Sequence, residues 1–254
     1  MYNRSMCGRY SLSAVDAKAV YERFRLANRS FDFQPRYNIA PGQMNPVVVS
    51  HSPNALQPML WGLIPHWAKD ESRKFQTINA RVEGIDKKAT YRDPFKHHRC
   101  LVPATGFYEW DKSTKPSTPY YFRLKDEELF AFAGLFDVWR DPHTQKELYS
   151  YTIITCPANG VVGKIHTRMP VILHKEDEAA WLNPDIFESA LLSTLLSIGI
   201  DYNAFEQLRS TAVILCDSPL FTITTKRVLN RQLEIVGNEV IIMVYLLELA
   251  TTAC

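Results

Sequence analysis

Apolar residues recur at helical spacing near the start of the chain. The residues that follow one another at i, i+3, i+4 and i+7 are Ala17, Val20, Tyr21 and Phe24. This spacing puts side chains on one face of an α-helix. Ser13 and Asp16 precede them with the spacing of a capping box, in which side chains satisfy the free backbone N–H groups of the first turn. We therefore predict a helix over residues 13–26.

Beyond this helix the pattern changes to short runs of β-branched and aromatic residues bounded by proline or glycine, which is typical of strands. We predict strands at residues 37–41, 46–50, 57–61, 99–103, 107–110, 120–124, 130–139 and 148–155. Helical composition is found at residues 158–165, 175–182 and 186–196. Near the end, residues 233–236 and 239–242 flank Gly237 and Asn238, a pair suited to the positive φ angles of a two-residue turn, and predict a β-hairpin.

The balance of these elements favours an α+β fold that is mostly β. The 254 residues suffice to bury a substantial core. The 15 prolines and the scarcity of long periodic segments disfavour a doubly wound sheet, which needs regular alternation of strand and helix. We expect a mixed, barrel-like β core with peripheral helices.

Composition limits the classes of partner. Lys and Arg total 29 and Asp and Glu total 27, so the net charge of +2 is too small for the broad field of a strongly basic nucleic-acid binder. Any DNA contact must be a local patch. The longest apolar run, residues 240–247, is too short to span a membrane, and the first residues lack the apolar core of a signal peptide. We expect a cytoplasmic protein with no membrane contact.

The cysteines support neither a disulfide framework nor a metal site. The five cysteines, an odd number and widely spaced, are Cys7, Cys100, Cys156, Cys216 and Cys254. The sequence has no Cys-x-x-Cys pair and no histidines clustered at zinc spacing. We expect a reducing compartment, no metal and no other cofactor.

Five segments join a reactive or phosphate-binding side chain to small, turn-forming or aromatic neighbours. They are residues 6–10 (Met-Cys-Gly-Arg-Tyr), 61–67 (Trp-Gly-Leu-Ile-Pro-His-Trp), 79–81 (Asn-Ala-Arg), 106–110 (Gly-Phe-Tyr-Glu-Trp) and 166–170 (His-Thr-Arg-Met-Pro). Together and in this order they resemble the SRAP family, the SOS-response-associated peptidases, whose members form thiazolidine crosslinks with abasic DNA. The resemblance also includes residues 37–41 and 99–104. It implies an SRAP-like domain over residues 6–230, with a divergent C-terminal hairpin and tail, residues 231–254, packed on it.

An N-terminal cysteine suits crosslinking chemistry. An abasic site opens to an aldehyde, an amine attacks the aldehyde to give a Schiff base, and an adjacent thiol closes a five-membered thiazolidine ring. Only a cysteine with a free α-amino group carries both nucleophiles on neighbouring carbons. The reference pKa of such an amine, about 7.7 to 8.0, leaves part of it unprotonated near neutral pH. The resemblance implies that Cys7 reacts in this way, whereas a lone cysteine is more often a small buried hydrophobic residue.

The residues before Cys7 set a condition on this chemistry. Met1 to Met6 precede Cys7 and hold its nitrogen in a peptide bond, which departs from the simplest family pattern. Either translation starts at Met6 and the initiator is removed, or the chain is cleaved after Met6, by itself or by another protease. We favour a start at Met6.

Two further residues are implied to handle protons. Glu109 lies among apolar and aromatic neighbours that could desolvate its carboxyl, and His166 lies at an element boundary, where side chains commonly face a cleft. The resemblance implies that Glu109 is the general acid/base for amine attack and loss of water, and that His166 promotes formation of the Schiff base. Outside the family, an exposed strand carboxylate and a structural histidine are the ordinary interpretations. Residues 96–99, Lys-His-His-Arg, predict a solvated basic loop.

The remaining site residues are implied to hold DNA. Asn79 and Arg81 alternate around Ala80, so an extended segment would present both side chains on one face. The resemblance implies that Asn79, beside the reacting sugar, hydrogen-bonds it and that Arg81 binds the adjacent phosphate. It further implies that Arg9 and Arg168 add phosphate contacts.

Two tryptophans bracket the segment of residues 61–67. We assign Trp61 to the core, as is usual for a tryptophan in a strand. We assign Trp67 to stacking on unpaired bases, an interaction with little sequence preference.

Three functional hypotheses follow. The main one is a single-turnover enzyme, lyase-like or hydrolase-like, that crosslinks Cys7 to abasic sites in single-stranded DNA; it is a monomer in the DNA damage response and lies on the nucleoid when bound to DNA. The second is a cysteine peptidase with Cys7 as nucleophile and His166 as base, acting mainly on its own N-terminus. The third is a non-catalytic single-strand binding module, which would keep its DNA affinity when Cys7 is replaced by alanine.

Overall fold

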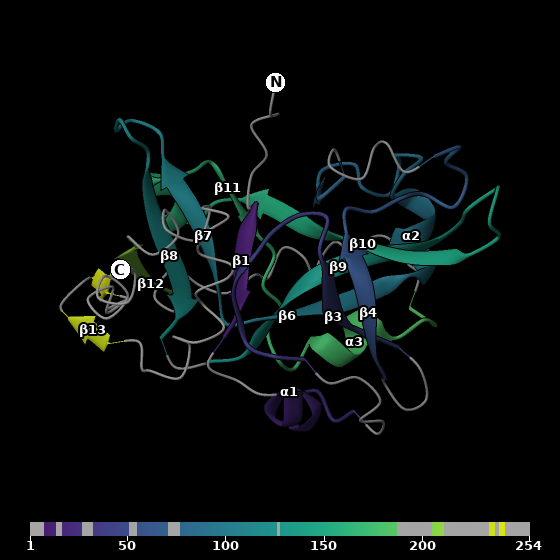
Figure 1. The fold of residues 1–254 in the computed structure, drawn as a ribbon, viewed down its shortest axis with the longest axis horizontal. Helices are drawn as coiled ribbons and strands as arrows, with labels where there is room; N and C mark the ends of the chain where they lie inside the picture. The colour runs from purple at the N-terminus through teal and green to yellow at the C-terminus, as the bar shows by residue number, and fades with distance from the viewer. Residues whose placement is uncertain are drawn as a thin grey trace, which may run out of the picture.

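The computed structural model describes residues 8–13, 17–26, 33–50, 55–70, 77–125 and 128–186, together with the backbone of three strands nearer the C-terminus (Figure 1). Cys7, Asp16 of the expected capping box and residues 187–196 of the last expected helix lie outside the described residues.

Five strands close into a ring. They are β3 (Met44–Val49), β4 (Ala55–Trp61), β6 (Arg99–Ala104), β9 (Phe130–Arg140) and β10 (Glu147–Pro157). In the order β4, β3, β6, β9, β10 each strand pairs antiparallel with the next, and β10 completes the ring by pairing parallel with β4. The predicted mixed, barrel-like β core is therefore confirmed.

Two short strands extend the barrel wall at one end of β10. β5 (Asn79–Arg81) pairs parallel with β10 over residues 153–155, and β11 (Arg168–Pro170) pairs antiparallel over residues 155–157. These pairings bring two segments that are far apart in the sequence to the same end of one strand.

A second sheet has the strand order β13, β14, β12, β8, β7, β1, β2. Its strands are β1 (Arg9–Leu12), β2 (Arg36–Ile39), β7 (Gly106–Asp111), β8 (Thr118–Leu124), β12 (Phe205–Ser210), β13 (Glu234–Val236) and β14 (Glu239–Ile241). Aromatic contacts join this sheet to the barrel: the ring of Tyr10 lies 5.1 Å from that of Trp61, and the ring of Phe107 lies 6.2 Å from that of Phe132. Edge-to-face pairs of this kind add to the free energy gained from burial alone.

The predicted strands and the hairpin are found where the pattern put them. All eight predicted strands are confirmed, and each observed strand begins and ends within two residues of the predicted boundaries. The C-terminal hairpin is confirmed as well, because β13 and β14 pair antiparallel with Val236 opposite Glu239. Strands β1, β5, β11 and β12 were not among the predicted strands.

The helices lie at the periphery and are short. They are α1 (Ala17–Arg23), α2 (Arg92–His97), α3 (Glu178–Leu182) and the 3-10 turn η1 (Val162–Lys164). The predicted stripe of α1 is confirmed, since Ala17, Val20, Tyr21 and Phe24 are all buried, but the helix ends before residue 26. Among the described helices, none is long and apolar enough to cross a membrane.

The expected solvated basic loop at residues 96–99 is wrong for its last residue. Arg99 is 3% exposed, and its guanidinium donates to carbonyls at the C-terminal ends of α2 and α3. Among them are the carbonyls of Phe95 at 3.0 Å and of Trp181 at 2.7 Å. The last carbonyls of a helix have no partner within the helix, and a guanidinium offers five N–H donors. Arg99 therefore joins two helix ends, and burial lowers its pKa to about 10.

Candidate functional site

Glu109 lies on the buried face of β7. Phe107 and Glu109 are two residues apart in an extended strand, so their side chains share a face. Phe107 stacks on Phe122 inside the core with ring centroids 5.2 Å apart, and Glu109 is only 3% exposed. Glu109 is therefore buried and not exposed on the strand surface.

The register of β1 against β7 points the N-terminal segment at this carboxyl. Arg9 pairs with Tyr108 and Tyr10 with Phe107, in antiparallel order. One further step of the same register sets Gly8 opposite Glu109. Gly8 itself brings no side chain to this position.

Thr155 of β10 is where the two other motif segments meet. Its carbonyl accepts a hydrogen bond from the amide of Val82, just after β5, at 2.9 Å, and another from the guanidinium of Arg168 in β11. Its hydroxyl donates to the carbonyl of Ala80 at 3.4 Å. The segments of residues 79–82 and 166–168 are thus held together through one residue.

Asn79 and Arg81 have the arrangement that their alternation predicted. Ala80 between them is fully buried, Asn79 is half-buried and Arg81 is exposed. The backbone around Asn79 is held from two sides, because the indole N–H of Trp61 donates to the carbonyl of Ile78 at 2.9 Å and the hydroxyl of Tyr91 donates to that of Asn79 at 3.3 Å. Arg81 is therefore a solvent-facing cation on a fixed strand.

His166 and Arg168 are locked to each other and to a carboxylate. The Nδ1 atom of His166 lies 3.2 Å from the backbone nitrogen of Arg168 and 3.4 Å from its carbonyl oxygen, so this ring nitrogen is held by the backbone. The guanidinium of Arg168 binds both carboxylate oxygens of Glu83, and its side chain is 11% exposed. The hydrogen bond from Arg168 is the main reason why the pKa of Glu83 is lowered. Arg168 is thus far less available to a ligand than Arg81.

Arg9 and the two tryptophans occupy different environments. Nη1 of Arg9 donates to Oδ1 of Asn38 in β2 at 3.0 Å. Trp61 is fully buried, which confirms its assignment to the core, whereas Trp67 is 52% exposed. Trp67 lies on a turn near Ser150 of β10, about 17 Å along that strand from Thr155 at a rise of about 3.3 Å per residue.

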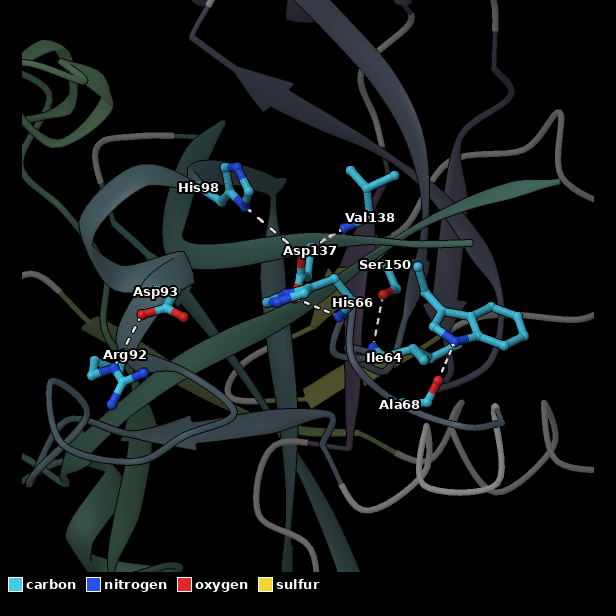
Figure 2. A network of polar contacts seen from close by, with 10 residues as sticks. Ile64, His66, Ala68, Arg92, Asp93, His98, Asp137, Val138 and Ser150 are labelled. Atoms are coloured by element: carbon cyan, nitrogen blue, oxygen red, sulfur yellow. Dashed lines mark hydrogen bonds and ion pairs between the residues drawn. The ribbon is translucent and has the colours of Figure 1, made fainter. Parts of the chain in front are cut away.

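A polar network beneath the Trp67 turn was not found from the sequence (Figure 2). Its centre is the carboxylate of Asp137, which is 2% exposed and accepts hydrogen bonds from the backbone N–H of His66 and of Val138, both at 2.8 Å. Nδ1 of His66 lies 3.0 Å from this carboxylate and Nδ1 of His98 lies 3.8 Å from it. Burial lowers the pKa of His98, and the charge of Asp137 opposes that effect. The signal that could have found the network is a carboxylate in an otherwise apolar strand, residues 130–139.

Nothing in the described part of the chain has the arrangement of a metal centre. No group of three or more His, Cys, Asp or Glu side chains there could hold a metal ion.

Comparison with known proteins assigns the chain to a family. Residues 6–213 match the SRAP family, described as SOS response associated peptidase, and the chain belongs to this family. It is 40% identical over 195 residues to the abasic site processing protein YoqW of Bacillus subtilis, covering 75% of this chain and 86% of that protein. It is 35% identical over 182 residues to the abasic site processing protein HMCES of Xenopus tropicalis, covering 59% of this chain and 54% of that protein.

Solved structures agree with the fold. A protein from Bacteroides thetaiotaomicron superposes with a TM-score of 0.73 at 32% identity, covering 84% of this chain and 96% of that one. A phage-related protein from Bordetella bronchiseptica superposes with a TM-score of 0.62 at 30% identity, covering 80% of this chain and 93% of that one.

Proposed function

We propose that this chain processes abasic sites in single-stranded DNA by forming a thiazolidine between Cys7, as the first residue, and the ring-opened abasic sugar. The names of its relatives, abasic site processing proteins, support the substrate. The observation that carries the chemistry is the β1 and β7 register, which sets Gly8, the neighbour of Cys7, opposite the buried Glu109.

The proposed reaction needs no oxidant and releases one water. The α-amine of Cys7 adds to the aldehyde carbon to give a carbinolamine, and this loses water to give an imine. The thiol sulfur then adds to the imine carbon while its proton passes to the nitrogen, which closes the ring. Because a proton must move at each stage, a carboxyl held close to the amine accelerates the sequence.

Glu109 is the proposed proton carrier. Consecutive Cα atoms lie about 3.8 Å apart, so Cys7 is at most one residue step from the position that faces Glu109. A carboxyl out of bulk water can exchange a proton with the reacting amine without competition from solvent. His166 is the proposed second proton carrier, since its Nδ1 is held by the backbone and its Nε2 is the nitrogen left to act on the sugar.

The DNA is proposed to lie across the end of β10 where β5 and β11 flank it. Arg81 is exposed there and would bind a phosphate, with Asn79 on the same face for the opened sugar. Arg9 is the proposed second phosphate contact. Arg168 can contact a phosphate only if its guanidinium first releases the carboxylate of Glu83. With a net charge of +2, such a local patch is the form of DNA binding that the composition permits.

Removal of Met1 to Met6 is the step that creates the reactive amine. In the chain as written the nitrogen of Cys7 is an amide, which does not form a Schiff base. The family match begins at residue 6, which supports Cys7 as the first residue of the active form. The proposal therefore predicts that a chain beginning at Cys7 is reactive and that a chain retaining Met1 to Met6 is not.

The test uses a single-stranded oligonucleotide with one abasic site, heated in detergent after incubation with protein. A chain beginning at Cys7 is expected to give a shifted band, and the chain that retains Met1 to Met6 is expected to give none. Cys7→Ser keeps the amine but not the thiol, so its band should appear only after reductive trapping. An equally strong untrapped band from Cys7→Ser would rule out the thiazolidine.

A further inference from the structure

The turn that carries Trp67 is exposed at its corners and fixed at its base. The amide of Ala68 donates to the carbonyl of Pro65 at 2.8 Å, which closes a β-turn with His66 and Trp67 at the corners. Trp67 is 52% exposed, and Met44 is the only other large apolar side chain exposed in the described part of the chain. A solvent-exposed indole on a turn suggests a binding role, because large apolar side chains are ordinarily buried.

One face of the β9 and β10 pair supports this turn. Asp137 lies directly opposite Ser150, and Trp139 lies directly opposite Leu148. Residues two apart in a strand share a face, so these four side chains form one patch, half polar and half apolar. Ile64 and Trp139 belong to one small apolar cluster, against which Leu148 also packs.

The polar members of the patch bond to both ends of the turn. The hydroxyl of Ser150 accepts the backbone N–H of Ile64 at 2.8 Å, before the turn. The indole N–H of Trp139 donates to the carbonyl of Ala68 at 2.7 Å, after it (Figure 2). The turn is thereby held on either side of its exposed corners.

Asp137 binds the corner itself. Its Oδ2 accepts both the backbone N–H of His66 at 2.8 Å and the ring Nδ1–H at 3.0 Å, so the carboxylate fixes the peptide unit and the side chain of the residue next to Trp67 (Figure 2). The carboxylate is almost fully buried, while the ring of His66 is 53% exposed. A charge is costly to bury unless hydrogen bonds compensate it, and here two of the compensating donors belong to the turn, while the N–H of Val138 is a third.

We propose that Asp137 is a positioning residue that holds the backbone of the turn so that Trp67 stands ready to stack on an unpaired base of single-stranded DNA, an inference that rests on the proposed role of Trp67. Its physical basis is pre-organisation. A turn already fixed in the binding conformation loses little entropy when a base stacks on the indole, so the stacking energy is retained as affinity. His66, the neighbour of Trp67 in the chain, transmits the hold through its two bonds to Asp137.

The test is a double-mutant cycle on affinity for a single-stranded oligonucleotide without an abasic site, so that only reversible binding is measured. Trp67→Ala is expected to weaken binding about tenfold, the scale of one base and aromatic stack. Asp137→Asn is expected to weaken it about fivefold when Trp67 is present and to add nothing in the Trp67→Ala background. Equal losses from Asp137→Asn in both backgrounds would overturn the inference, because they would mean that Asp137 acts otherwise than through Trp67.

A readout independent of DNA accompanies the cycle. Hydrogen exchange at the amide of His66, which Asp137 binds, should become faster in Asp137→Asn, and unchanged exchange there would also overturn the inference. If Asp137→Asn does not fold, His66→Ala takes its place, since it removes the ring bond and keeps the backbone bond; its expected loss is about twofold to threefold, again only when Trp67 is present.

The matched control removes a carboxylate from the same strand pair. Glu147 bonds Arg140 at 2.8 Å across β9 and β10, and both side chains are exposed. Glu147→Gln should leave affinity and exchange as they are in the wild type. The proposed function is tested separately, by crosslinking of the wild type to an abasic oligonucleotide. If the wild type crosslinks but the effects of Asp137→Asn and Trp67→Ala on affinity are additive, only the role of Asp137 is contradicted. If a wild type beginning at Cys7 never crosslinks, the proposed function itself is contradicted.

Discussion

The reacting end of the proposed site and its DNA-binding end are built in opposite ways. At the reacting end, strand alternation takes Glu109 into the core, where it is 3% exposed opposite the chain that leads to Cys7. In the two regions proposed to contact DNA, which lie at different positions along β10, Arg81 and Trp67 are exposed, while the groups that fix the backbone near each of them are buried. In the proposed function, the difference teaches that proton transfer would depend on exclusion of water, whereas recognition would depend on exposed groups carried by rigid backbone.

The largest expected effect comes from the reacting end. Glu109→Gln keeps the size of the side chain and removes its ability to exchange a proton, so the crosslinking rate should fall about 100-fold or more. Affinity for the same oligonucleotide should stay within about twofold, because a buried carboxyl is not a phosphate contact. Rates come from quenched time points on denaturing gels.

Asp111→Asn is the matched control for this change. Asp111 lies two residues further along β7, and its carboxylate caps the exposed turn that follows by accepting the amide of Ser113 at 2.8 Å. Its crosslinking rate should equal that of the wild type. If Glu109→Gln crosslinks at the same rate as the wild type, Glu109 does not carry protons in the reaction, and the two ends do not differ in function as proposed.

A smaller effect is expected at Arg81, on affinity for DNA and not on the crosslinking rate. Arg81→Ala removes one exposed cation, so affinity should fall about threefold to tenfold and the slope of log affinity against log salt should flatten by about 0.7, the value for one phosphate of a single strand. The crosslinking rate at saturating DNA should be unchanged. Arg140→Ala, which removes another exposed arginine, serves as the control, and an equal loss from it would mean that the effect is general charge rather than a site.

The smallest effect is expected at Glu83. Glu83→Gln frees the guanidinium of Arg168, so affinity for single-stranded DNA should rise about twofold to threefold at low salt. Weaker binding would mean that Arg168 supports the backbone and never reaches a phosphate.

The same pair makes a prediction about pH. The pKa of Glu83 is lowered in the folded protein, so its pairing with Arg168 contributes fully above the unfolded value and is lost as pH falls through the folded value. Because Glu83 is half exposed, this contribution is small. Any difference in stability between the wild type and Glu83→Gln should therefore be present at neutral pH and vanish in acid, as measured by urea unfolding.

The sequence predicted the parts of the fold that repeat a pattern. Eight strands were found because alternation and β-branched composition extend over four or more residues. β1 and β11 were not, since Arg9–Leu12 and Arg168–Pro170 are short and carry arginine or proline rather than a strand pattern. Helix α2 was missed for a related reason, because Pro94 lies within its six residues.

Contacts between distant segments were beyond the sequence altogether. The positions of Asn79 and Arg81 on one face followed from local alternation, and the burial of Glu109 followed from its apolar neighbours. The pairing of Arg168 with Glu83 and the bond of Asp137 to His66 depend on which strands pair and in which register. Local pattern does not contain that information.

The most direct test of the central claim is to identify the atoms of Cys7 that the DNA occupies. The conjugate of an abasic oligonucleotide with the chain beginning at Cys7 would be treated with a thiol-alkylating reagent, digested with trypsin and read by mass spectrometry. The account predicts that the modified peptide is Cys7 to Arg9, that its mass is the sum of the peptide and the abasic oligonucleotide in its aldehyde form less one water, and that its thiol resists alkylation because the sulfur is in a ring. A conjugate attached through a lysine, or one in which the thiol of Cys7 is still alkylated, would contradict it.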